Sequence, residues 1–189
     1  STANDGDTVF IPQGTMFASG NSPNSDGQRA IDVSVSGGLA QNLIIKGETD
    51  ANGEPASEIK IPDSIGGWHY LLEVTVGSGL TQTVEDLKLN YNQRGHSVTS
   101  GGSCIYYRDQ DAGVSNDIQF TNCYLQGGYD VIFRVLDTNG VVFDNCTFDY
   151  SETNHCLAID QKNLTKSNAE ATPCRARNCL FLRAEQTVN

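Results

Sequence analysis

The segments Phe120–Cys123 (FTNC), Phe143–Cys146 (FDNC) and Ala176–Cys179 (ARNC) repeat one pattern that ends in Asn-Cys. Their Asn residues lie 23 and 33 residues apart. Repeats of roughly 20–50 residues are typical of solenoids, propellers and arrays. The unequal steps disfavour leucine-rich and WD40 repeats, whereas a parallel β-helix needs only matching strands and tolerates loops of different length. The repeat therefore predicts an all-β fold, a right-handed parallel β-helix.

About six coils can be counted along the chain. Short runs alternate apolar and polar residues over a few positions, which is strand periodicity, and Gly, Asn, Asp and Ser separate them. No segment has the pattern of an amphipathic helix of three turns. We expect the register of the repeat to extend backward from Phe120 to Leu89, Ile45 and Ile11, which completes the six coils.

Equivalent residues of such a fold stack on one another, because each strand pairs with its counterpart one coil away. We therefore expect Phe120 over Phe143, and Cys123 over Cys146 over Cys179. The three Asn residues of the repeat should form a ladder at a bend. Asn suits this place because it tolerates left-handed backbone geometry and can bond turn backbone groups.

The composition limits the classes of function. The chain has 189 residues, enough for one domain spanning 1–189, and a net charge of −11. This charge argues against nucleic acid and against anionic membrane surfaces as partners, and no apolar run is long enough to span a bilayer. The acidic surface fits an extracellular, cell-surface or virion location. The chain begins with Ser1 and carries no signal peptide, which indicates a mature or trimmed product.

The six cysteines include no CxxC pair, so the usual zinc spacing is absent. Their even number permits disulfides and an oxidising compartment. The stack of Cys123, Cys146 and Cys179 is most simply core filling, although its neighbours are near disulfide distance and a bond is compatible with that spacing. A disulfide between Cys156 and Cys174 would pin the insertion between them. Asn145 and Asn163 each begin an N-glycosylation sequon.

Two stretches carry a family resemblance. The segment 6–15 (GDTVFIPQGT) resembles the opening coil of pectin-lyase-like β-helix proteins, and the segment 128–160 resembles the central coils of the polygalacturonase family. The resemblance covers nearly the whole chain as a fold signal. It implies a polysaccharide as the partner, either a substrate or a bound surface glycan.

The catalytic carboxylates of polygalacturonases are missing from the matching positions. Gly127 stands where the family has its first catalytic Asp, and Asn154-His155 stands where the family has two Asp before Cys. Glycoside hydrolysis needs two positioned carboxyl groups, so the resemblance argues against hydrolysis by that mechanism. A polysaccharide lyase, with Arg or Lys as its base and a cation such as calcium to neutralise a uronate, stays open.

One strand of each coil should present outward polar residues in a stripe across the coils. Arg binds sugar carboxylates in a bidentate manner, and Tyr offers a flat face to a pyranose ring. We expect either a glycan-binding groove here or an ordinary solvated sheet face. The catalytic candidates on or near the stripe are Arg108, Arg134, His155 and Lys162. The residues expected to bind substrate are Glu73, Tyr106, Arg108, Asp130, Arg134, Asp160 and Lys162.

A short acidic loop is the weak candidate for a metal site. Asp50, Asn52 and Glu54 place oxygen ligands around Gly53, as calcium loops do, but the full loop of that motif is absent. An ordinary turn is therefore the favoured interpretation, and no cofactor other than calcium is suggested.

Three functions remain open. The first is a glycan-binding, spike-like or adhesin-like β-helix, the second a polysaccharide lyase or an unfamiliar hydrolase, and the third a structural solenoid that assembles through its ends. Both ends look uncapped, which suggests a fragment of a longer chain, neighbouring domains or a homotrimer. In a trimer, exposed Ile132 and Leu136 on the stripe would be the contacts.

Overall fold

The computed structural model describes residues 6–18, 29–34, 42–62, 70–75, 81–92, 103–108, 117–128, 131–136, 140–149, 155–160, 174–182 and 186–188. The regular secondary structure of these residues is β-strand, and none of the described segments is helical. The described part of the chain accordingly contains no helix long and apolar enough to cross a membrane.

The strands form three parallel sheets, named here sheets A, B and C. Sheet A contains, in order of pairing, β1 (Asp7–Phe10), β4 (Leu43–Lys46), β7 (Thr81–Glu85), β10 (Asp117–Thr121), β13 (Val141–Asp144) and β16 (Arg175–Arg177). Sheet B contains β2 (Gly14–Phe17), β5 (Ser57–Lys60), β8 (Leu87–Asn90), β11 (Tyr124–Gln126), β14 (Thr147–Asp149) and β17 (Leu180–Leu182). Sheet C contains β3 (Arg29–Ser34), β6 (Tyr70–Thr75), β9 (Ser103–Arg108), β12 (Val131–Leu136), β15 (His155–Asp160) and β18 (Gln186–Val188).

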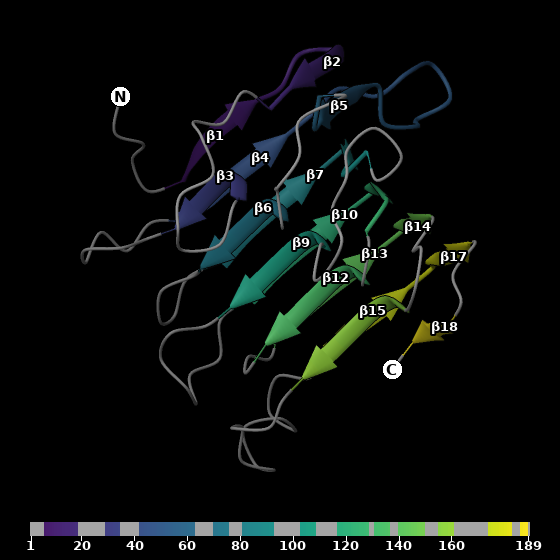
Figure 1. The fold of residues 1–189 in the computed structure, drawn as a ribbon. Helices are drawn as coiled ribbons and strands as arrows, with labels where there is room; N and C mark the ends of the chain where they lie inside the picture. Colours follow the sequence, from purple (N-terminus) through teal and green to yellow (C-terminus); the bar gives the residue numbers. More distant parts are fainter. Residues whose placement is uncertain are drawn as a thin grey trace.

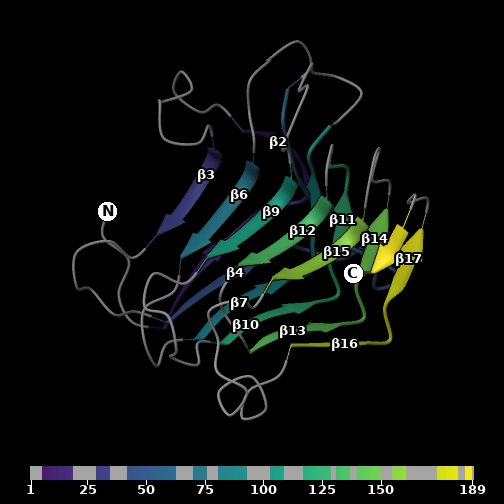
Figure 2. The same cartoon turned by 60° about the horizontal axis from the view of Figure 1, so that its bottom comes forward.

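Each coil contributes one strand to each sheet, so the chain visits A, B and C in turn and then repeats. Figure 1 shows the strands of successive coils stacked side by side from the purple end to the yellow end, and Figure 2 shows the three sheets around a common interior. Six strands in each sheet make six coils. The expected parallel β-helix of about six coils is therefore confirmed.

Aromatic rings form the centre of the core. Phe120 and Phe143 stack across neighbouring coils of sheet A with their ring centroids 5.3 Å apart, as the repeat predicted. Phe133 of sheet C meets both rings edge-on, at 5.2 Å and 4.8 Å. Phe148 of sheet B packs against Phe143 at 5.1 Å. One cluster of buried rings therefore joins all three sheets, and edge-to-face pairs of this kind add stability beyond their buried area.

The register differs from the expected one in the first coils. Val84, and not Leu89, pairs with both Phe120 and Ile45, because Leu89 belongs to sheet B and pairs with Leu125. Likewise Val9, and not Ile11, pairs with Ile45. The error has a simple cause: only one corner residue separates β7 from β8, and both strands carry alternating apolar residues that fit the pattern equally well.

The expected Asn ladder forms at the corner between sheets A and B. Asn122, Asn145 and Asn178 have φ angles of 51°, 54° and 53°, and Asp86 occupies the same place one coil earlier with φ 56°. Left-handed geometry costs most residues energy, whereas Asn and Asp adopt it more readily. Gly47 precedes Asp86 in this column. A Cβ atom at Gly47 would lie 2.2 Å from the carbonyl oxygen of Asp86, so only glycine fits there. We call Asp86, Asn122, Asn145 and Asn178 the ladder.

Candidate functional site

The register of sheet C aligns most of the residues predicted for the stripe. Two columns of backbone positions lie two residues apart along the strands. The first column is Asp32, Glu73, Tyr106, Arg134 and Ala158, and the second is Ser34, Thr75, Arg108, Leu136 and Asp160. Neighbouring coils are spaced about 4.8 Å apart and strand positions about 3.3 Å apart, so the backbone positions of Arg108 and Arg134 lie about 8 Å apart diagonally.

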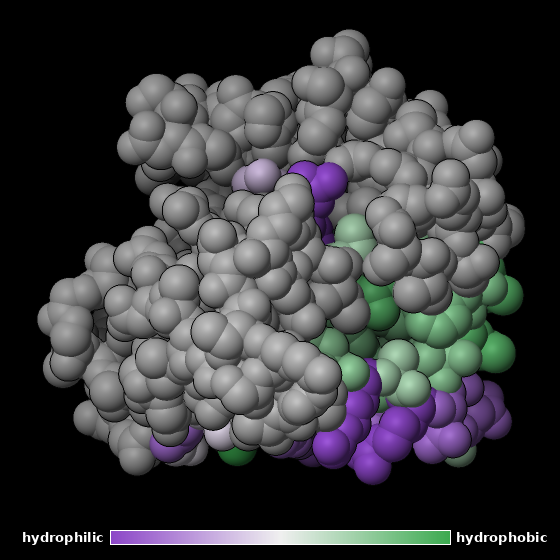
Figure 3. All heavy atoms as spheres, turned by 90° about the horizontal axis from the view of Figure 1, so that it is seen from below, coloured by the Kyte–Doolittle hydropathy of each residue, from purple (hydrophilic) through white to green (hydrophobic). Residues whose placement is uncertain are grey.

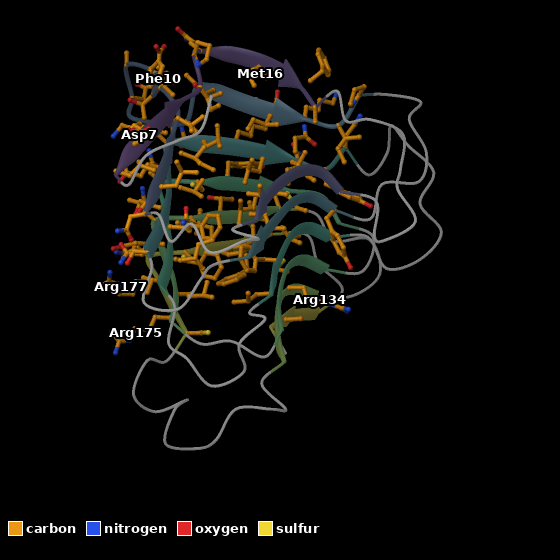
Figure 4. The ribbon with its side chains drawn as sticks, turned by 90° about the vertical axis from the view of Figure 1, so that its left-hand side faces the viewer. Asp7, Phe10, Met16, Arg134, Arg175 and Arg177 are labelled. Atoms are coloured by element: carbon orange, nitrogen blue, oxygen red, sulfur yellow. The ribbon has the colours of Figure 1, made fainter. Side chains whose placement is uncertain are left out.

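Arg134 is the one charged residue of these columns whose side chain the structure describes. It is half-buried, and Figure 4 shows it pointing away from the core on the side of the solenoid opposite Arg175 and Arg177. The arginines of sheet A therefore cannot converge with Arg134 on one ligand. Among the arginines that the structure describes, only those of sheet C can form a cluster with Arg134.

The other predicted site residues fall into two groups. Asp130 and Lys162 lie outside the described residues. His155 begins β15 and pairs with Val131 and Gln186, three positions before Ala158, so the register places it in neither column.

The burial of Ile132 contradicts the expectation that this residue is exposed on the stripe. It is fully buried, as is its neighbour Phe133, so it offers no exposed contact for a trimer. Simple alternation fails here because the pairing between β12 and its neighbours skips Ile132, and both residues turn inward. Leu136 lies in the second column, and the structure describes its backbone but not its side chain.

The acidic loop 48–56 is a compact turn. The Asp50 carboxylate accepts hydrogen bonds from the backbone N–H groups of Asn52, at 2.8 Å, and Glu54, at 3.0 Å. The bonds from Glu54 and Asn52, in that order of effect, lower the pKa of Asp50. The described residues contain no cluster of three or more His, Cys, Asp or Glu side chains that could hold a metal ion. The Asp50 carboxylate thus organises the turn.

This loop also forms one wall of a groove that no pattern in the sequence indicates. Asn122 of the ladder donates from Nδ2 to the carbonyl oxygen of Gly53 at 2.9 Å, which holds the loop against the corner between sheets A and B. Below this contact lies a cavity of about 160 Å³, named here the corner groove. Its lining residues are Glu54, Pro55, Asn122, Cys123, Tyr124, Asn145, Cys146, Thr147, Asn178 and Leu180. The repeated Asn-Cys motif marked the corner, but the contact with a loop two coils away left no sequence signal.

Polar side chains on the outward face of sheet B form a network that reaches this groove at Tyr124. Glu58 accepts hydrogen bonds from Thr15, at 2.8 Å, and Asn90, at 2.9 Å, and lies 3.5 Å from Lys88 Nζ. Burial raises the pKa of Glu58, but the bonds from Asn90 and Thr15 outweigh it and leave the pKa below its ordinary value. Lys88 in turn lies 5.3 Å from the ring centroid of Tyr124, a cation–π contact.

All six cysteines are free thiols in the structure. The stack of Cys123, Cys146 and Cys179 follows the corner as predicted, and the first two are buried. A disulfide between Cys156 and Cys174 does not form. The two residues belong to different sheets, since Cys156 lies in β15 with its thiol toward the Leu182 carbonyl oxygen at 3.8 Å, and Cys174 directly precedes β16.

Apolar side chains are exposed on both end coils. Phe10 and Phe17 of the first coil are 54% and 58% exposed, and Leu180 of the last coil is 59% exposed. Figure 3, which looks at the molecule from below, shows a green apolar area beside a purple hydrophilic one. A cavity of about 230 Å³ near the first coil is lined entirely by apolar residues, namely Val9, Ile11, Met16, Leu43, Ile45, Ile59, Leu72, Val84, Leu87 and Leu89.

Comparisons of the chain with protein-family models, with curated proteins and with solved structures found no match. The strand pairing alone therefore assigns this chain to the class of parallel β-helix proteins.

Proposed function

We propose that this chain is a β-helix that recognises an acidic polysaccharide through the outward face of sheet C, at a cell surface, on a virion or in another extracellular setting. The observation that carries the proposal is the register of Tyr106 with Arg134, with Arg108 one position diagonally away. An aromatic ring can pack against a sugar, and guanidinium groups pair with carboxylates. The resemblance to pectin-lyase-like proteins supports the same class of ligand.

A polysaccharide lyase would use the same face, so one experiment should separate binding from cleavage. Acidic and neutral polysaccharides are incubated with the protein, with and without calcium, and binding, unsaturated products and new reducing ends are measured together. Binding without new products supports recognition, whereas unsaturated products support a lyase. New reducing ends without unsaturation would indicate an unfamiliar hydrolase.

The matched variants are Arg134→Ala and Arg175→Ala. Both remove one positive charge, but Arg175 lies in sheet A on the opposite side of the solenoid (Figure 4). We expect Arg134→Ala to weaken binding of the acidic polysaccharide about tenfold, because a hydrogen bond to a charged group contributes about 1.5–3 kcal/mol. Arg175→Ala should leave binding unchanged. Equal losses in the two variants would mean nonspecific attraction and would contradict the proposed site.

The exposed apolar end coils favour a second candidate, assembly through the ends. Phe10 and Phe17 at one end and Leu180 at the other leave apolar surface in water, and the strands of these coils are edge strands. Edge strands readily pair with other chains. Light scattering across a dilution series tests this candidate: self-association that Phe17→Ser or Leu180→Ser abolishes supports it, and a monomer at every concentration contradicts it.

A further inference from the structure

The hydrogen bonds from Asn145 to Asn122 and from Asn122 to Asp86 all run in one direction, and Asp86 sets that direction. A carboxylate only accepts hydrogen bonds, so Asn122 turns Nδ2 toward Asp86 Oδ1, at 2.9 Å, and its own Oδ1 toward the next coil. Asn145 donates to that Oδ1 at 3.0 Å. Asn178 does not continue the series, because its Nδ2 donates to Asp144 Oδ1 at 3.1 Å. Among the described residues no group donates to Asn145 Oδ1, so the ladder ends on an open acceptor in the corner groove.

Two further oxygen-bearing side chains of the groove are open. The Glu54 carboxylate and the Thr147 hydroxyl make no hydrogen bond or ion pair with any residue that the structure describes, and both line the groove with Asn145. Glu54 comes from the loop of the second coil, and Thr147 comes from β14 of the fifth. Groups from distant parts of the chain thus offer acceptors to one small space.

Apolar surface completes the walls. Tyr124, Pro55 and Leu180 line the groove beside the oxygen atoms. Tyr124 is held in place, since its hydroxyl donates to the buried Asp149 carboxylate and Lys88 lies over its ring. Small-molecule sites combine apolar and aromatic side chains with a few convergent polar groups, and this groove contains both kinds of side chain.

The size of the groove limits the ligand. Its volume is about 160 Å³. This space suits one sugar ring and is smaller than the roughly 300–1,000 Å³ of sites for drug-sized ligands. Glu54 and Asn145 are exposed to water, so a ligand that replaces this water has to donate hydrogen bonds to them, and the single carboxylate disfavours an anion.

We infer that the corner groove binds one neutral sugar residue, whose hydroxyl groups donate to Glu54, Asn145 and Thr147 while its C–H face packs on Tyr124 and Leu180. This site is independent of the face of sheet C, because it lies at the corner between sheets A and B. A calcium ion fits the groove less well. Calcium takes about six to eight oxygen ligands, commonly from several carboxylates, whereas Glu54 is the one carboxylate among the lining residues.

The test is a titration of the ¹⁵N-labelled protein followed by NMR. The probes are the methyl β-glycosides of glucose, galactose, xylose and glucuronic acid, and calcium chloride alone. We expect at least one neutral glycoside to shift the backbone amide signals of Glu54, Asn145 and Thr147. The glucuronide should bind more weakly than the glucoside, because its carboxylate meets Glu54.

Two variants and one control define the site. Glu54→Gln keeps the shape and removes the charge, and we expect it to weaken binding about tenfold. Thr147→Val removes only the hydroxyl, and a loss of about threefold to tenfold is expected. Gln119→Ala changes an exposed residue on the outward face of sheet A and should leave affinity unchanged. An unchanged spectrum away from each substitution confirms that the variants fold.

Four outcomes would overturn the inference. These are the absence of shifts with every glycoside, shifts confined to sheet C, equal losses in Gln119→Ala and the groove variants, and a response of the groove amides to calcium but to no glycoside. Failure of polysaccharide binding by sheet C leaves this test intact, because the probes and the variants differ.

Discussion

Asn145 lies one coil below Asn122 and donates from its Nδ2 to the Oδ1 of Asn122 across 3.0 Å. Asn122 in turn donates from Nδ2 to Asp86 Oδ1 and to the carbonyl oxygen of Gly53. Its amide group therefore makes three hydrogen bonds, one of them to the loop. Both Asn residues have positive φ, as the corner between sheets A and B requires. One side chain therefore links coil stacking, corner geometry and the wall of the groove.

Replacing Asn122 tests these roles separately. Asn122→Ala removes the three hydrogen bonds and places a Cβ-bearing residue without a polar side chain at φ 51°, so we expect a loss of about 2–4 kcal/mol in the free energy of unfolding. Asn122→Gly removes the same bonds but relieves the strain, and it should be about 1 kcal/mol more stable than Asn122→Ala. Urea denaturation measures both. Equal stabilities of the two variants would show that the left-handed geometry costs nothing here.

Substitution of Gly47 should lower the stability of the fold more strongly, at the same corner. A Cβ at this position would meet the Asp86 carbonyl oxygen at 2.2 Å and Ser57 Cβ at 2.9 Å, so Gly47→Ala forces the backbone to move. We expect a loss above about 3 kcal/mol, as for other overpacked and strained sites. Gly6→Ala is the control: its φ of 80° is unfavourable for alanine, but nothing lies within 4 Å of the added Cβ. Thermal unfolding should rank Gly47→Ala well below Gly6→Ala.

The ladder also shows what the sequence could reveal. Identical letters made Asn122, Asn145 and Asn178 easy to align, and stacking of equivalent residues then follows from strand spacing alone. Asp86 was missed, although Val84-Glu85-Asp86-Leu87 matches Phe120–Cys123 in chemistry. Asp shares with Asn the tolerance for left-handed geometry, so a search for that property would have found it.

The candidate sites were less predictable, for a physical reason. Alternation along a strand predicted Glu73, Tyr106 and Arg134 for one stripe, and the strand register aligns their backbone positions in one column. It fails at Ile132, which the strand pairing skips and where two successive residues are buried. The corner groove depends on a contact between Gly53 and Asn122, 69 residues apart, which no local pattern encodes.

The ring cluster predicts the largest effect of a core substitution. Phe143 touches Phe120, Phe133 and Phe148 with centroid distances from 4.8 to 5.3 Å, and its side chain is buried. Phe143→Ala should cost about 3–5 kcal/mol, because it removes a buried ring and leaves a cavity between three sheets. Phe10→Ala in the same sheet changes a ring that is 54% exposed and should cost about 0.5 kcal/mol or less. Comparable losses in urea denaturation would contradict a core centred on Phe143.

The buried thiols predict that alkali destabilises the fold. Burial raises the pKa of Cys156 to about 11 from an ordinary value of 9.0, and burial raises the pKa of Cys104 further. Above pH 9 the unfolded chain loses these thiol protons while the folded chain keeps them. The folded state then binds more protons, so the free energy of unfolding falls as pH rises from 9 toward 11. Below pH 9 both states hold the protons, and these thiols give no pH dependence.

Cys156→Ala separates this effect from other titrations at high pH. Removing one thiol whose pKa is raised should make the decline between pH 9 and pH 11 shallower by up to about 1.4 kcal/mol per pH unit, since each thiol contributes at most one proton. Cys179→Ala is the comparison: burial also raises the pKa of Cys179, but this side chain is only partly buried, so we expect a smaller change in slope. Urea denaturation at closely spaced pH values under reducing conditions gives the slopes. Parallel curves for Cys156→Ala and the parent protein would show that Cys156 ionises as easily in the folded state as in the unfolded chain.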